Sequence, residues 1–172
     1  MFTKDLLKQI EFETDFKKID ELSKTNLSAI FEEKILNFFG KLSNNIFKRK
    51  DLRKYPDLAS YAFFCRKNNI LKFKKKYQSF EKNRYGRGVS LHFTPSNVPL
   101  NFAYSLFFGL ITGNSCIIRI SDNQSYQSKI LIKEINNLLK IKNYFSIKKK
   151  IIILRYKKNK SITDILSKIC DV

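Results

Sequence analysis

The sequence predicts an α/β protein in which amino-terminal helices precede half of an open, mostly parallel sheet. The second half of the chain alternates strand and helix patterns three times, and its strands at residues 116–120 and 151–154 are almost wholly apolar. Strands of that kind are buried on both faces of parallel sheets, and right-handed crossovers join them. We therefore expect a helical amino-terminal region over residues 1–84 and a partial, Rossmann-like dinucleotide-binding domain over residues 85–172.

Composition favours a globular fold and gives no firm reason for nucleic-acid binding. Apolar residues make up 43% of the chain, and glycine (5) and proline (3) are scarce, which argues against disorder and long flexible linkers. The net charge of +19 comes mainly from lysine. Lys, Asn, Ile and Phe all have A/T-rich codons, so base composition explains this excess. The alternative is a basic module for nucleic acid or acidic partners, which requires exposed aromatics among clustered lysines; most aromatics here fall on apolar helix faces.

The cysteines and the single histidine give no metal site and no nucleophile motif. Cys65, Cys116 and Cys170 are far apart in the sequence, and His92 has no Cys or Asp motif beside it. We expect each thiol to be a small buried group and His92 to be structural. An odd number of cysteines without a secretory signal favours a reducing cytoplasm. The longest apolar stretch, residues 98–111, is shorter than the about 20 residues that cross a bilayer, so no membrane span is expected.

The amino-terminal half is expected to be mainly helical. Residues 1–27 are charged and weakly patterned, and a helix is the expectation there. A clearer helix begins at Ser28, a suitable N-cap, and a second begins near Pro56, which suits a first helical turn. Residues 70–84 are basic and alternating, which favours a strand or an exposed loop. The helix after Ser28 is predicted from six apolar residues at helical spacing: Phe31, Ile35, Phe38, Phe39, Leu42 and Ile46.

Turn and cap residues separate the elements of the carboxy-terminal half. Ser121 or Asp122 can cap the second helix of this half, and Ser161 with Asp164 forms a capping-box-like pair at the third. Three parallel strands leave an unpaired edge, so a missing continuation after the last helix is the natural expectation. The expected order is strand 88–94, a helix from Pro99 to Gly113-Asn114, strand 115–120, helix 124–140, strand 151–156 and helix 161–170.

A polar turn between the first strand of this half and its helix has the character of an anion site. Backbone N–H groups are free at a helix N-terminus, and the helix dipole favours negative charge there. The side-chain amide of Asn97 can donate into the same space, which is the role of a side chain in an oxyanion hole. The alternative is that Ser96 or Asn97 only caps the following helix.

The run of residues 86–122 resembles the aldehyde-dehydrogenase superfamily. There, a strand leads to a proline–x–asparagine–x–proline turn, then to a helix that ends in Gly-Asn, then to a strand that ends in a basic residue. Here these features are the turn at residues 95–99 (PSNVP), Gly113-Asn114 and Arg119. Within the superfamily, the chain more closely resembles the acyl-CoA reductase of bacterial luminescence, the LuxC family. That resemblance extends over residues 26–172, through the segments 53–58, 63–67, 92–99, 101–106, 113–115 and 118–119.

The resemblance implies a role for individual residues of this run. Asn97 would bind the oxyanion of a thioester or thiohemiacetal intermediate. Arg119 stands where the superfamily commonly has a lysine that contacts the adenosine ribose, and arginine there suits the 2′-phosphate of NADPH; the alternative is a strand-end side chain that only reaches water. Asp122 falls where NAD-using relatives place an acidic ribose ligand, which leaves NADPH and NADH both open. The nicotinamide side of the cofactor would be lined by the backbone of Phe93, Thr94, Pro95 and Ser96.

The activity that the resemblance implies is NADPH-dependent reduction of a fatty acyl-CoA, or of an acyl-carrier substrate, to the aldehyde. Catalysis in this family needs a cysteine nucleophile that forms a thioester, which then accepts hydride from the cofactor. That cysteine lies downstream of the matched region, so the 172-residue chain is expected to be an inactive amino-terminal fragment. Its expected partners are the acyl substrate and either a separate carboxy-terminal half or further copies of itself in a homo-oligomer; nucleic acid is not expected.

Overall fold

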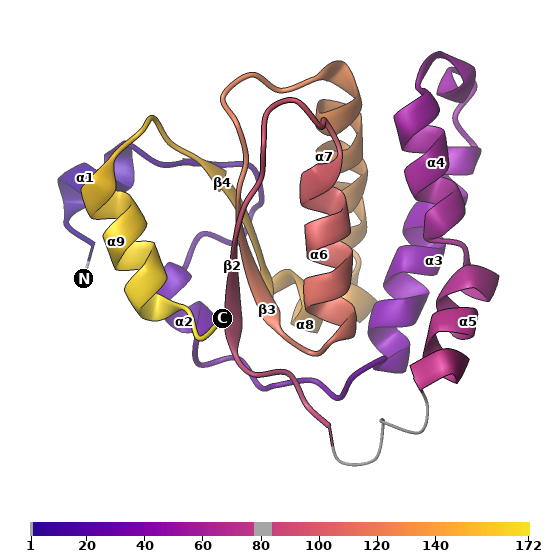
Figure 1. Cartoon of the computed structure of the whole chain (residues 1–172), viewed down its shortest axis with the longest axis horizontal. Helices are drawn as coiled ribbons and strands as arrows, with labels where there is room; N and C mark the ends of the chain where they lie inside the picture. Colours follow the sequence, from indigo (N-terminus) through magenta and orange to yellow (C-terminus); the bar gives the residue numbers. More distant parts are fainter. Residues whose placement is uncertain (1, 78–83) are drawn as a thin grey trace.

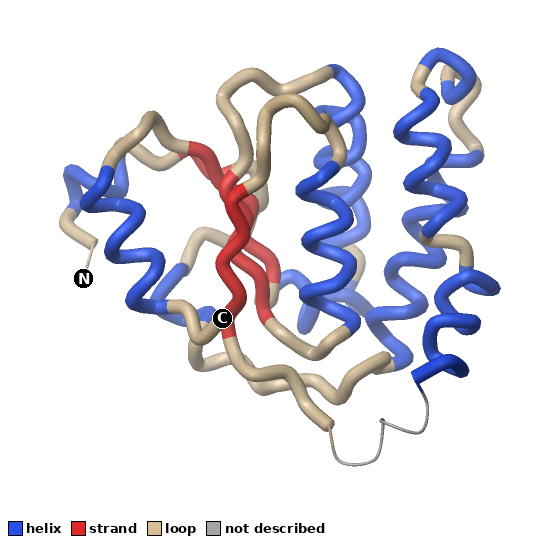
Figure 2. Tube along the Cα trace, viewed as in Figure 1, coloured by secondary structure: helices blue, strands red, loops and turns tan. Residues whose placement is uncertain are grey.

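A four-stranded sheet with helices on both faces forms the body of the molecule (Figure 1, Figure 2). The computed structural model describes residues 2–77 and 84–172. The strands are β1 (Glu11–Phe12), β2 (Val89–Phe93), β3 (Ser115–Arg119) and β4 (Ile151–Arg155). Their order is β1-β4-β3-β2, and the pairs β2–β3 and β3–β4 are parallel. This arrangement confirms the predicted α/β class with an incomplete Rossmann-like sheet.

Helices cover both faces of the sheet and add an outer layer on one of them. They are α1 (Lys4–Lys8), α2 (Ile19–Leu22), α3 (Glu33–Phe47), α4 (Pro56–Phe64), α5 (Lys67–Tyr77), α6 (Asn101–Ile111), α7 (Tyr126–Leu139), α8 (Phe145–Lys148) and α9 (Lys160–Ile169). α6 and α7 lie on one face with α3, α4 and α5 outside them, whereas α1, α2 and α9 lie on the other face (Figure 1). Each face has its own apolar core. Among the described helices, none is long and apolar enough to cross a membrane.

The amino-terminal segment contributes a strand that its sequence does not predict. A helix is expected over residues 1–27, but the structure has two short helices, α1 and α2, with β1 between them. β1 pairs antiparallel with β4, and Arg155 of β4 forms ion pairs with Glu11 and Glu13. The expectation of one helix is wrong because a two-residue strand is too short for its alternation to show. The division of the chain at residue 84 stays a prediction.

α3 is confirmed as an amphipathic helix, but it begins at Glu33 rather than at Ser28. Phe31 has a φ of 54°, a left-handed conformation through which a helix cannot continue. Ser28 is buried; its N–H donates to the carbonyl of Gly113, and its carbonyl accepts from the N–H of Gly86. Ser28 therefore joins three segments of the chain and is not the N-cap of α3.

The outer helices show one confirmed boundary and one error. α4 begins at Pro56, in line with the preference of proline for the first helical turn. α5 is a helix where the sequence favours a strand or an exposed loop, and residues 78–83 of that prediction lie outside the described part of the chain. Ile70 is the buried residue of α5, and Phe73 contacts Phe64 of α4 with ring centroids 5.7 Å apart. So narrow an apolar face among lysines leaves little helical periodicity in the sequence.

The strands and helices of the second half occur in the predicted order, but the helices begin at other residues than predicted. α6 begins at Asn101, and Pro99 lies in the turn before it. Ser125 caps α7 by accepting from the N–H of Ser128, and Asn159 caps α9 in the same way. Both caps have extended backbone conformations, so the chain turns into the helix at these residues and not earlier or later. They stand in place of the predicted caps, Ser121, Asp122 and Ser161.

The last residues of the chain lie along β2. The N–H groups of Asp171 and Val172 donate to the carbonyl of Val89, and the N–H of Leu91 donates to the carbonyl of Val172. The carboxylate of Asp171 also accepts from the N–H of Val89 at 2.9 Å. With β1 on the β4 side, both edges of the three parallel strands are at least partly paired. This finding corrects the expectation of an unpaired edge.

Candidate functional site

The carboxyl ends of the three parallel strands meet at one edge of the sheet, and the predicted site residues follow them (Figure 1). Phe93 ends β2 and lies opposite Arg119, which ends β3. Thr94 comes next and is buried; its backbone N–H and its Oγ1 both donate to the carbonyl of Arg119, each at 3.1 Å. These two bonds fix the start of the polar turn against the end of β3.

The polar turn is anchored at its base and exposes its asparagine. The carbonyl of Pro99 accepts from Ser128 Oγ at 2.6 Å, which ties the turn to the first turn of α7. Beneath the turn, Pro95 and Ser96 line a cavity of only about 20 Å³, which has room for about one water molecule. Asn97 is exposed, and within the described residues no hydrogen bond holds its side-chain amide.

Neither Ser96 nor Asn97 caps α6. The N-cap position of α6 is Leu100, and no side-chain capping bond is made there. The alternative that these polar side chains only cap the helix is therefore wrong. The amide of Asn97 is left able to donate to a ligand, and the nearby N-terminal end of α6 favours a ligand with negative charge.

A larger cavity lies beside Arg119, between the strand ends and α9. Its volume is about 520 Å³, within the range of small-molecule sites. The guanidinium of Arg119 donates to the carbonyl of Tyr156 at 3.1 Å and lies 5.5 Å from the centre of the Tyr156 ring. Lys158 and Lys160 also line the cavity, as does Asn159, the N-cap of α9. Three cations and a helix N-terminus suit the phosphate groups of a nucleotide.

The predicted site residues fall into three groups in the structure. One group lines the larger cavity, one lines the small cavity, and one is exposed and lines neither of these two cavities. The groups are Phe93 with Arg119, then Thr94 with Pro95 and Ser96, and finally Asn97 with Asp122. The acidic residue expected beside the ribose is thus not part of the cavity that holds the arginine.

Five residues of the larger cavity were not predicted from the sequence: Tyr156, Lys158, Asn159, Lys160 and Thr163. All of them follow β4, whose carboxyl end lies beside that of β3. Ligands of open α/β sheets bind outside the carboxyl ends of the strands. The lysine-rich segment directly after the third predicted strand was therefore a signal that could have identified them.

His92 belongs to a small hydrogen-bonded cluster under α6. Its Nε2 lies 2.9 Å from Ser90 Oγ, which also approaches Cys116 Sγ at 3.6 Å. Burial lowers the pKa of His92, so the ring is neutral at pH 7. α6 packs on this cluster at Gly109, where an added Cβ would press against Cys116 Sγ. These contacts support the structural role expected for His92.

No cysteine of the chain has the environment of a nucleophile. Cys65 and Cys116 are buried, and Cys170 is half-buried. Burial raises the pKa of the Cys65 and Cys116 thiols to about 12 and that of Cys170 to about 11. Each is therefore a neutral thiol at physiological pH. Among the described residues there is also no group of His, Cys, Asp and Glu side chains that could hold a metal ion.

Alkylation rates test the state of these thiols. At about pH 7.5 we expect iodoacetamide to modify each cysteine of the folded chain at least about 100-fold more slowly than in urea, because a pKa of about 11 instead of 9 reduces the thiolate fraction about 100-fold. Cys170, the least buried, should react first. Mass spectrometry of timed samples measures each site. A cysteine that reacts equally fast in the folded and unfolded chain would contradict the assignment.

These features define an α/β protein of incomplete Rossmann-like fold, with a polar turn and a cationic cavity at the carboxyl edge of its sheet. The family model for acyl-CoA reductase (LuxC) matches residues 3–172, so the chain belongs to the acyl-CoA reductase (LuxC) family. The match confirms the resemblance to the LuxC family that was identified from the sequence. Members of this family act on acyl substrates and use a nicotinamide cofactor. A comparison with curated proteins found no significant match.

Proposed function

We propose that this chain is the amino-terminal portion of a fatty acyl-CoA reductase that uses NADPH to reduce an acyl-CoA, or an acyl-carrier thioester, to the aldehyde. The position of Arg119 carries the proposal. Arg119 ends the middle one of the three parallel strands and lines a cavity with Lys158 and Lys160. The phosphates of dinucleotides bind at this edge of open α/β sheets. The family match supports the acyl chemistry.

Charge supports NADPH rather than NADH as the cofactor. The planar guanidinium of Arg119 can hold a 2′-phosphate with two parallel hydrogen bonds. Lys158 and Lys160 line the same cavity and would attract the added negative charge. Asp122, which would repel a 2′-phosphate, is exposed and does not line this cavity. The donors present thus fit the phosphorylated cofactor.

Asn97 is the residue that we propose for stabilising the oxyanion. Its exposed amide lies between β2 and α6, so its NH₂ group can donate to a substrate carbonyl oxygen as that oxygen becomes negatively charged. The backbone of residues 93–96 would hold the nicotinamide side of the cofactor next to that oxygen. When bound, the cofactor would supply the hydride.

The chain alone is expected to have no reductase activity. The reaction requires a cysteine that forms an acyl thioester, and the three thiols here are neutral and at least half buried. Activity would require assembly with a separate carboxy-terminal half that carries the nucleophile; a homo-oligomer of this chain would not supply one. Acyl-CoA-dependent oxidation of NADPH by the purified chain measures this, and clear turnover would refute it. NADPH binding, followed by fluorescence in the same sample, is still expected.

A further inference from the structure

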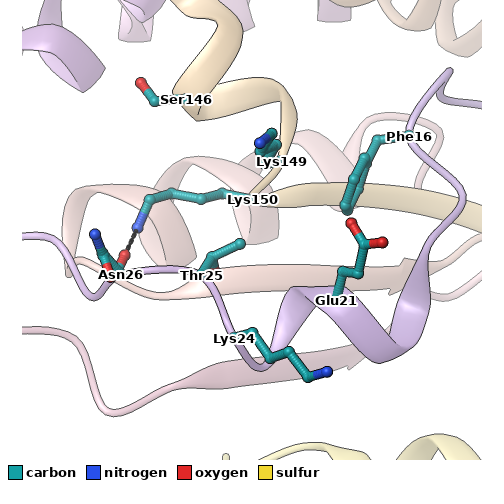
Figure 3. Close-up of a pocket in the computed structure, with 8 residues that line it drawn as sticks. All are labelled: Phe16, Glu21, Lys24, Thr25, Asn26, Ser146, Lys149 and Lys150. Atoms are coloured by element: carbon teal, nitrogen blue, oxygen red, sulfur yellow. Dashed lines mark hydrogen bonds between the residues drawn. The ribbon is translucent and has the colours of Figure 1, made fainter.

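A second cavity lies at the opposite end of the strands from Arg119 (Figure 3). Its volume is about 570 Å³. One wall is the segment after α2, with Lys24 and Asn26; the other is α8 with the residues after it, including Ser146, Lys149 and Lys150. Lys150 directly precedes β4, whereas the residues proposed for the cofactor follow the strands. The two cavities are therefore separate sites on the sheet.

Lys150 is a buried cation that forms no ion pair with a carboxylate of the described residues. Only 8% of its surface is exposed. Its Nζ donates to the backbone carbonyl of Asn26, so this hydrogen bond joins the two walls of the cavity (Figure 3). Within the described part of the chain, no Asp or Glu forms an ion pair with it. Burial lowers the pKa of Lys150, and the negative charge of Glu32, which forms no ion pair with it, opposes that shift only in part. A buried ammonium in this state is costly unless an anion pairs with it.

The other charged groups of this cavity add to the positive potential. Lys24 and Lys149 are exposed at its rim. Glu21 is the acidic residue among the lining side chains, and its carboxylate is held by Lys18 Nζ at 2.6 Å. The exposed Ser146 hydroxyl can donate one more hydrogen bond. Three lysines and a serine line this cavity, with Lys24 extending away from Lys150 in Figure 3, and their donors suit the acceptors of a phosphoryl group.

We propose that this cavity binds a phosphoryl group, carried either by inorganic phosphate or by a small phosphate monoester. Lys24 and Lys149 would contact the anion directly at the rim, and Lys150 would supply the buried counter-charge. A cavity of about 570 Å³ has room for the organic part of a phosphorylated metabolite as well as for the phosphate. The site does not depend on the proposed cofactor site, because it uses none of its residues.

Calorimetric titration of the 172-residue chain with inorganic phosphate and with glycerol phosphate, at constant ionic strength, tests the proposal. Arg119→Met serves as the background, so that anion binding at the other end of the sheet does not contribute. In that background, Lys24→Ala with Lys149→Ala should weaken binding of both probes at least about fivefold. The matched control is Lys140→Ala with Lys168→Ala, which removes two exposed lysines that do not line the cavity and should leave affinity unchanged.

The outcomes separate the sources of the ligand. Tighter binding of glycerol phosphate than of inorganic phosphate would identify a phosphorylated metabolite, and the reverse order would identify free phosphate; both support the site. Equal losses in the rim pair and in the control pair would show only screening of the overall charge and would overturn the proposal, as would unchanged affinity in the rim pair. Lys150→Met should abolish binding where it folds, and the rim pair decides the question where it does not.

Discussion

Replacing Gly113 with alanine is expected to destabilise the folded chain by about 3 kcal/mol. Gly113 has a φ of 87°, a left-handed conformation that residues with a side chain rarely adopt. An added Cβ would press against the carbonyl oxygen of Ser28 and lie 2.6 Å from the backbone nitrogen of Gly86. Neither neighbour can move freely, because the N–H of Gly86 donates to that same carbonyl at 3.0 Å. The substitution therefore adds backbone strain to a steric clash.

Urea unfolding followed by circular dichroism measures this loss as a lower transition midpoint. Gly40→Ala is the matched control, because Gly40 lies within α3 and an added Cβ would lie 3.7 Å from Lys67 Cβ, an ordinary contact. There, the lower backbone entropy of alanine should raise the free energy of unfolding by up to about 1 kcal/mol. Equal midpoints for Gly113→Ala and the unchanged chain would rule out the crossing of three segments seen at Gly113.

Asn114, which follows Gly113, holds together the two segments that enter the strands of the cofactor edge. Asn114 Oδ1 accepts from the N–H of Arg87 at 2.6 Å and from the N–H of Gly88 at 3.3 Å. One side chain thus holds the segment that enters β2 against the turn that enters β3. The register in which Phe93 faces Arg119 at the other end of these strands starts from this contact. The Gly113-Asn114 pair acts on the cofactor edge through the strands, not by contact with a ligand.

Strands β3 and β4 could be predicted because a run of apolar residues indicates a strand that is buried on both faces. The first four residues of β3 and of β4 are all buried, and in β4 they are all aliphatic. That pattern admits few alternatives to a strand covered on both faces. Helix α3 could also be predicted, because its apolar residues recur at helical spacing and are buried. Resemblance then located the polar turn and Arg119, which composition could not have distinguished from ordinary surface residues.

The remaining features depend on contacts between distant segments, which a local pattern does not contain. β1 is a strand because Glu11 and Glu13 meet Arg155, far along the chain, and because Thr14 Oγ1 accepts from the N–H of Ile153. The larger cavity exists because the segment after β4 returns toward Arg119. Likewise, Lys150 is buried without an ion-pair partner only because distant segments enclose its side chain. In each case the cause is a set of tertiary contacts and not the local secondary-structure propensity of the segment.

Arg119→Met is expected to weaken NADPH binding about thirtyfold and NADH binding less than about threefold. Hydrogen bonds to a charged group contribute about 2 kcal/mol, which corresponds to about thirtyfold in affinity. Methionine keeps an unbranched apolar stem but removes the guanidinium, and with it both the charge that would meet a 2′-phosphate and the contact with the Tyr156 ring. Fluorescence titration of the purified chain with each cofactor measures both affinities, and their ratio is the informative quantity.

Two controls make this ratio specific to the phosphate. Asn97→Ala should leave both affinities nearly unchanged, because the Asn97 amide is proposed to act on the substrate oxygen and does not line the cavity of Arg119. Unfolding in urea should show that Arg119→Met costs only about 1 to 2 kcal/mol, from the loss of one hydrogen bond to the Tyr156 carbonyl and of the contact with its ring. Equal losses for NADPH and NADH would instead mean that Arg119 contacts a part common to both cofactors. A preference for NADPH would then have to come from Lys158 and Lys160, and without such a contribution the proposal of NADPH as the cofactor would be wrong.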